Sequence, residues 1–96
     1  MNQRVVITGM GVVSPVGNNL SDFWQNLVSG YCGIDKIKGF DEYDLPISLA
    51  GQVKNFDPEA NGLSRNDVRR SDLYCQFALA AAYQAMADSG LVAGEN

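Results

Sequence analysis

The chain has 96 residues, of which 46% are hydrophobic and 19% charged, and its formal net charge is −4. These values exclude a disordered, fibrous or strongly basic chain, describe one small acidic globular domain, and make nucleic acid an unfavourable partner. The chain has no histidine and no Cys-x-x-Cys pair, which excludes an imidazole base, a Ser-His-Asp triad and the common zinc sites, and we predict no metal and no cofactor.

The first predicted element is a strand over residues 4–13, which is apolar on both faces. This pattern is typical of a central strand buried between covering helices. Gly9 and Gly11 carry no side chain, so we expect another segment to pack close to them or the backbone to bend. The longest apolar run is too short for the roughly 20 residues of a spanning helix, and no signal-peptide cleavage pattern follows it. We therefore expect a cytoplasmic protein that does not insert into a membrane.

Residues 9–14 also begin like a dinucleotide-binding fingerprint placed after a strand. Ser14, however, stands where the third glycine belongs, and Pro15 follows it. Without a helix that opens at this point, no N-terminal N–H groups are available for a pyrophosphate. The sequence therefore disfavours a dinucleotide site, and residues 14–19 are predicted to form a turn.

A short helix is predicted over residues 22–29, with Ser21 as its N-cap and Gly30 at its C-terminal end. Its large apolar side chains fall on one face: Phe23, Trp24, Leu27 and Val28. Residues 31–63 contain many glycines and prolines and are predicted to be mostly loop, with a brief strand over residues 47–53. A loop of this length suggests that it lies against something larger.

Two acidic groups in this loop could be mistaken for metal sites. Residues 57–62 imitate the start of a calcium loop, but Val68 stands where the bidentate glutamate belongs. A surface turn is the favoured interpretation. The second group has no visible metal or acid–base partner and is interpreted as a solvated loop; it consists of Asp41, Glu42 and Asp44.

The last predicted element is a helical region over residues 64–89 that ends at Gly90. Ser64 and Asp67 form a relative of the capping box at its start. Six alanines between residues 78 and 87 leave a nearly bare surface, which favours tight packing. The side chains at helical spacing on the predicted inner face are Tyr74, Phe77, Ala78, Ala81 and Ala85.

Three arginines share one side of the first turns of this region: Arg65, Arg69 and Arg70. They could form a simple exposed face or pair with Asp67 and Asp72. They could equally bind a partner that bears phosphate or carboxylate groups, since guanidinium groups bind both bidentately. Their spacing alone leaves these alternatives open.

The order of these motifs resembles the N-terminus of the β-ketoacyl-acyl carrier protein synthases, closest to type II. The resemblance extends over essentially all of the chain. It rests on RVVITGMGVVSPVG at residues 4–17, Phe23-Trp24, Gly30, Gly33-Ile34, Phe56-Asp57, RRSD at residues 69–72 with Gln76, and AMADSGL at residues 85–91.

This resemblance implies an α/β chain that is part of a thiolase-like fold: a central buried strand, a short helix, a long loop and a long alanine-rich helix. It implies a homodimer that condenses malonyl-acyl carrier protein with an acyl thioester in fatty acid elongation. The family uses a cysteine nucleophile and two histidines that lie downstream, so residues 1–96 are expected to be an incomplete N-terminal part of the ketosynthase domain, without catalytic residues.

The resemblance also implies a role for the arginines. The family typically carries basic residues here that face the acidic carrier protein, and these match Arg69 and Arg70, with Arg65 adjacent. Asn66 departs from the pattern, which weakens the patch. A non-catalytic thiolase-like partner, such as a chain-length factor, or a carrier-binding module is the alternative. The isolated 96 residues are expected to self-associate or to be unstable, because one central strand without neighbours buries too little surface.

Overall fold

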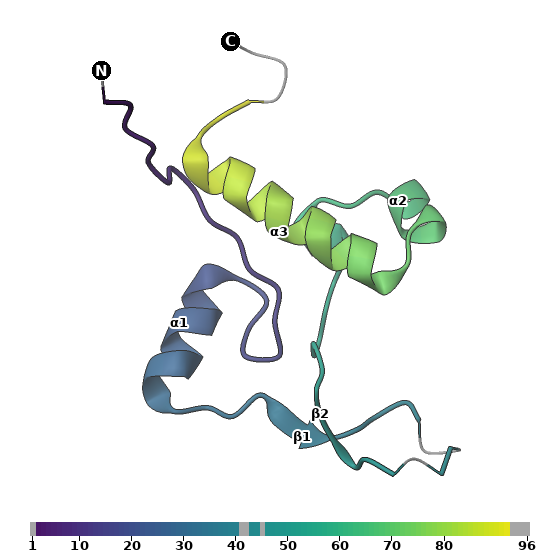
Figure 1. Cartoon of the computed structure of the whole chain (residues 1–96). Helices are drawn as coiled ribbons and strands as arrows, with labels where there is room; N and C mark the ends of the chain where they lie inside the picture. The colour runs from purple at the N-terminus through teal and green to yellow at the C-terminus, as the bar shows by residue number, and fades with distance from the viewer. Residues whose placement is uncertain (1, 41–42, 45, 93–96) are drawn as a thin grey trace. The chain divides into compact units, whose positions relative to one another are not determined.

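The structure is a computed structural model that describes residues 2–40, 43–44 and 46–92 (Figure 1). It forms two compact units, one from residues 1–12 and 57–96 and the other from residues 13–56. The elements in chain order are α1 (Leu20–Ser29), β1 (Ile34–Lys36), β2 (Leu49–Gly51), the 3₁₀ helix η1 (Glu59–Asn61), α2 (Arg65–Arg70) and α3 (Leu73–Ser89).

In the unit of residues 13–56, α1 begins two residues earlier than the sequence predicted. Asn19, not Ser21, is the N-cap, and its side-chain oxygen accepts a hydrogen bond of 2.8 Å from the Asp22 amide. Asparagine caps a helix as well as serine does, so both residues were competent caps, and in the structure Asn19 takes the position. The predicted C-terminal end is confirmed, because Gly30 has the left-handed φ of 82° that glycine adopts without strain.

The loop of this unit contains one antiparallel strand pair. β2 confirms the strand expected within residues 47–53, whereas β1, with Ile34 opposite Gly51, was not predicted. Three residues are too few to show the alternation that identifies a strand. A tight turn closed by two backbone hydrogen bonds between Ser14 and Gly17 precedes α1. Gly33 is buried against this turn, and a Cβ on it would lie 3.0 Å from the Pro15 Cβ.

In the other unit, residues 9–12 run along α3. A Cβ on Gly9 would lie 2.5 Å from the Ser89 nitrogen, and one on Gly11 would lie 2.6 Å from the Gln84 Cβ. These contacts confirm the prediction that another segment packs close to both glycines. Between them, the Met10 amide donates to Asp88 Oδ2 at 3.0 Å. The glycines therefore allow the backbone to reach the helix directly.

The predicted central buried strand over residues 4–13 is wrong for this structure. No strand is assigned to residues 2–13, and the side chains of Val5 and Ile7 are 94% and 80% exposed. A central strand needs a hydrogen-bonded neighbour on each edge. In the described part of the chain the strands are β1 and β2, which pair with each other, so residues 4–13 have no strand to join.

The predicted single helical region over residues 64–89 is two helices, because Ser71 and Asp72 are extended. Gln76 lies at the junction with only 6% of its surface exposed. Its side-chain nitrogen donates to the Ser71 carbonyl at 2.9 Å and to the Val68 carbonyl at 3.4 Å. These bonds satisfy carbonyls that the end of α2 leaves without helical partners. The end of α3 at Gly90 is as predicted, with φ of 75°.

The buried core of the described residues is small. Leu63 is 3% exposed and Ala80 is fully buried, and no large side chain is fully buried. Ala80 was not on the predicted inner face of α3, and Tyr74, which was, is 72% exposed. The predicted apolar face of α1 is also uncovered, since Trp24 is 64% exposed. Within the described residues, many large apolar side chains are therefore exposed.

Candidate functional site

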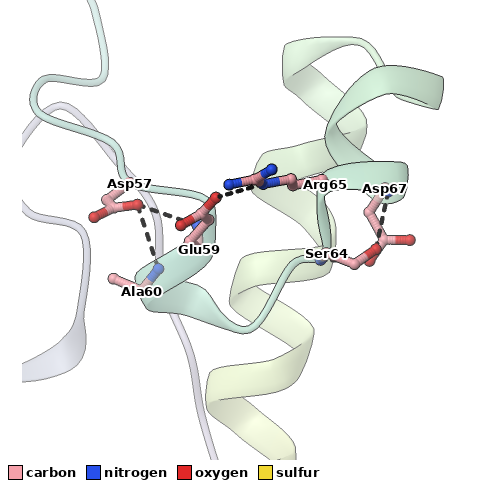
Figure 2. Close-up of polar contacts among 6 residues, drawn as sticks. All are labelled: Asp57, Glu59, Ala60, Ser64, Arg65 and Asp67. Carbon is pink, nitrogen blue, oxygen red and sulfur yellow. Dashed lines mark hydrogen bonds and ion pairs between the residues drawn. The ribbon is translucent and has the colours of Figure 1, made fainter.

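Helix α2 carries the three candidate arginines, and a capping box fixes its start. The Ser64 Oγ accepts a hydrogen bond from the Asp67 amide at 3.1 Å, and Asp67 Oδ2 accepts one from the Ser64 amide at 3.0 Å. Figure 2 shows both residues at the start of the helix. The predicted cap is confirmed, and the Asp67 carboxylate is engaged with the backbone instead of an arginine.

The turn before α2 positions the carboxylate of Glu59 near Arg65. Asp57 Oδ1 accepts hydrogen bonds from the amides of Glu59 and Ala60 at 3.1 and 3.3 Å (Figure 2). This local capping starts η1 and explains why residues 57–62 form a turn. It also places Glu59 Oε1 3.9 Å from Arg65 Nε. Both side chains are largely exposed, at 70% and 89%, so this ion pair is weak.

The sequence left the partners of the arginines open, with Asp67 and Asp72 as one alternative. In the described part of the chain the ion pair instead joins Arg65 to Glu59. The signal that could have identified Glu59 is Asp57 before Pro58, a start signal for a short helix that turns the next residue towards α2. Arg69 and Arg70 are exposed and form no ion pair within the described residues.

A shallow hollow of about 380 Å³ lies beside this helix, and its lining is mixed in charge. Arg65 and Arg69 face it together with the carboxylates of Asp57 and Glu59. The positive excess is therefore in the last turn of α2, at Arg69 and Arg70. Cations are favourable there because the carbonyl end of a helix carries partial negative charge.

The remaining chemical groups offer little for catalysis. Cys32 is exposed and Cys75 half-buried, and both are free thiols. A hydrogen bond of the Tyr74 phenol with the neighbouring Cys75 side chain raises the pKa of this exposed phenol above its usual value. Within the described residues, no group of three potential ligands could hold a metal ion. No helix there is both long and apolar enough to cross a membrane.

Comparison with known proteins decides the family. Residues 2–96 match the model of the β-ketoacyl synthase N-terminal domain. The chain belongs to this family. The resemblance that the motifs predicted is thereby confirmed.

Curated relatives of this β-ketoacyl synthase chain are named 3-oxoacyl-[acyl-carrier-protein] synthase 2. One from Coxiella burnetii is 47% identical over 97% of the chain, and one from Vibrio cholerae is 45% identical over 97%. One from Staphylococcus aureus is 43% identical over 99%. The chain spans only 22–23% of the length of these relatives.

Proposed function

We propose that the protein containing this chain is a 3-oxoacyl-acyl carrier protein synthase of type II. Such an acyltransferase condenses an acyl group with malonyl-acyl carrier protein in fatty acid biosynthesis. The proposal is carried by the identity of 43–47% to synthases of this name over 97–99% of the chain. Residues 1–96 would form the N-terminal part of the ketosynthase domain, within a thiolase-like fold and a cytoplasmic homodimer.

In this proposal the 96 residues supply no catalytic group. They contain no histidine, whereas the family resemblance implies two histidines and a cysteine nucleophile. Neither Cys32 nor Cys75 matches the position of that nucleophile. The segment is therefore expected to have no condensing activity alone and to contribute the local fold and part of the surface on which the carrier docks.

The dock that we propose consists of Arg65, Arg69 and Arg70. Arg69 and Arg70 are exposed and free of ion pairs within the described residues, so their guanidinium groups can donate bidentate hydrogen bonds to a carboxylate or phosphate. Arg65 already forms an ion pair with Glu59, with 3.9 Å between Arg65 Nε and Glu59 Oε1. We therefore expect Arg69 and Arg70 to contribute most of the attraction for an acidic carrier, and Arg65 less.

The activity is tested on the purified full-length protein with acyl and malonyl thioesters of the carrier protein. Formation of the 3-oxoacyl product supports the synthase. A protein that binds the carrier but forms no product would instead be the non-catalytic partner.

The dock is tested by Arg69→Glu combined with Arg70→Glu in the full-length protein. We expect kcat/KM for carrier-linked substrates to fall about tenfold or more, because exposed charges act mainly on the rate at which the two proteins associate. The fall should be smaller at high salt, because salt screens exposed charges. Pantetheine-linked substrates should change little. The control, Arg4→Glu, reverses a charge at an exposed position outside the arginine dock. Equal loss on both substrate types would assign the arginines to folding, and equal loss in both variants would assign the effect to net charge.

A further inference from the structure

All three lysines of the chain line one hollow in the unit of residues 13–56. The hollow has a volume of about 450 Å³ and lies beside the β1–β2 strand pair. Lys36 and Lys38 come from β1 and the residues after it, and Lys54 follows β2. The position of these residues was not identified as a site from the sequence, because Lys54 is remote from the other two along the chain.

The backbone that carries two of these lysines is held in place by side chains of the same unit. Gln52 bonds Lys38 twice: its Oε1 accepts from the Lys38 amide at 2.9 Å, and its Nε2 donates to the Lys38 carbonyl at 3.0 Å. The Lys54 carbonyl accepts a hydrogen bond from Asn18 at 2.7 Å. The wall of the hollow is therefore a bonded framework and not a free loop.

The Lys54 ammonium is held as well. Its Nζ lies 3.3 Å from the Tyr31 hydroxyl and 3.4 Å from the Gly33 carbonyl, and 5.6 Å from the centre of the Tyr31 ring. An ammonium group has three donors. After these two contacts, one N–H of Lys54 remains for a ligand.

The charge of the hollow is opposite to that of the chain. Three lysines face a single acidic residue, Asp35, in a chain of net charge −4. The Asp35 Oδ1 accepts a hydrogen bond of 2.7 Å from the Lys36 amide. Within the described residues none of the three lysines forms an ion pair with a carboxylate. Like charges gathered in this way repel one another until an anion neutralises them.

We propose that this hollow binds an anion that bears a phosphate group. Lysine ammonium groups bind phosphate as point charges, and the volume falls in the range of small-ligand sites. The proposal does not rest on carrier docking, because the lysines belong to residues 13–56 and the arginines to α2.

The test is equilibrium dialysis of the full-length protein with radiolabelled inorganic phosphate at constant ionic strength. We expect saturable binding that weakens about tenfold in Lys36→Gln combined with Lys38→Gln, since two attractive charges are removed. The control, Arg4→Gln, removes a positive charge at an exposed position outside the hollow and should bind phosphate as the unmodified protein does. Circular dichroism checks that all variants are folded.

Competition distinguishes the two sources of the phosphate group. If glycerol 3-phosphate displaces the radiolabelled phosphate as effectively as unlabelled phosphate does, the site is assigned to a phosphate ester. If only unlabelled phosphate displaces it, the site is assigned to the free ion. Absence of saturable binding, or equal loss in the lysine and arginine variants, would overturn the proposal.

Discussion

The substitution Gln76→Met tests whether one buried amide holds α2 in position. Methionine has nearly the same shape as glutamine but cannot donate to the Ser71 and Val68 carbonyls, which now lie 2.9 and 3.4 Å from the Gln76 nitrogen. Loss of the shorter bond in a site only 6% exposed should cost about 1–3 kcal/mol, and the longer bond adds little. We take about 2 kcal/mol as the expected loss of local stability.

Hydrogen exchange of the full-length protein, followed by mass spectrometry on peptides that cover α2, measures this loss. A change of about 2 kcal/mol corresponds to about 30-fold faster exchange where α2 opens locally. The KM for carrier-linked substrates should rise as well, because the arginines are carried by the helix that has loosened. The control Gln25→Met lies on an exposed position of α1 and should leave α2 unchanged. Unchanged exchange in Gln76→Met would refute the reasoning.

Further substitutions and one truncation test other parts of the fold and site. Gly11→Ala should lower the free energy of unfolding by about 1–3 kcal/mol in urea titrations, because its Cβ would lie 2.6 Å from that of Gln84; an unchanged midpoint would contradict the close packing. Asn19→Ala should lower the free energy of unfolding by about 1 kcal/mol in the same titrations, and Ser21→Ala should lower it much less, since Asn19 is the N-cap. The reverse order would show that Ser21 is the N-cap. Glu59→Gln should raise carrier affinity about twofold in low salt by removing a nearby negative charge, and the gain should vanish in an Arg65→Gln background if the 3.9 Å contact is its cause. The isolated 96-residue segment should self-associate or unfold without cooperativity in ultracentrifugation and thermal melts, and a sharply melting monomer would contradict this.

The features that were predictable from sequence are those that depend on neighbouring residues. The Ser64–Asp67 capping box and the glycines that end α1 and α3 are local signals, and the structure has them where they were expected. The break between α2 and α3 was missed because it depends on Gln76, whose amide bonds carbonyls five and eight residues away. Helical periodicity carries no information about such a bond.

The prediction of a buried strand over residues 4–13 was wrong for a different reason. Apolar character on both faces predicts what a strand prefers to contact, but not whether its partners are present. Residues 2–13 have no strand neighbour within the described part of the chain, so their side chains remain exposed. At the candidate site, the sequence placed the arginines in the first turns of one long helix, whereas the structure has them on the separate helix α2. The ion pair of Arg65 with Glu59 was not predicted, although Asp57 before Pro58 signals the short helix that positions Glu59.

The pairing of residues 9–12 with α3 has a consequence for register. The amides of Met10 and Val12 donate to Asp88 and Gln84, each at 3.0 Å. Two residues of extended chain advance about 6.6 Å, and four residues of helix rise about 6.0 Å, so the two spacings match closely. The helix therefore sets which residues of this segment face it, as a neighbouring strand would in a sheet. Insertion of a residue between Met10 and Val12 should therefore break one of these two bonds.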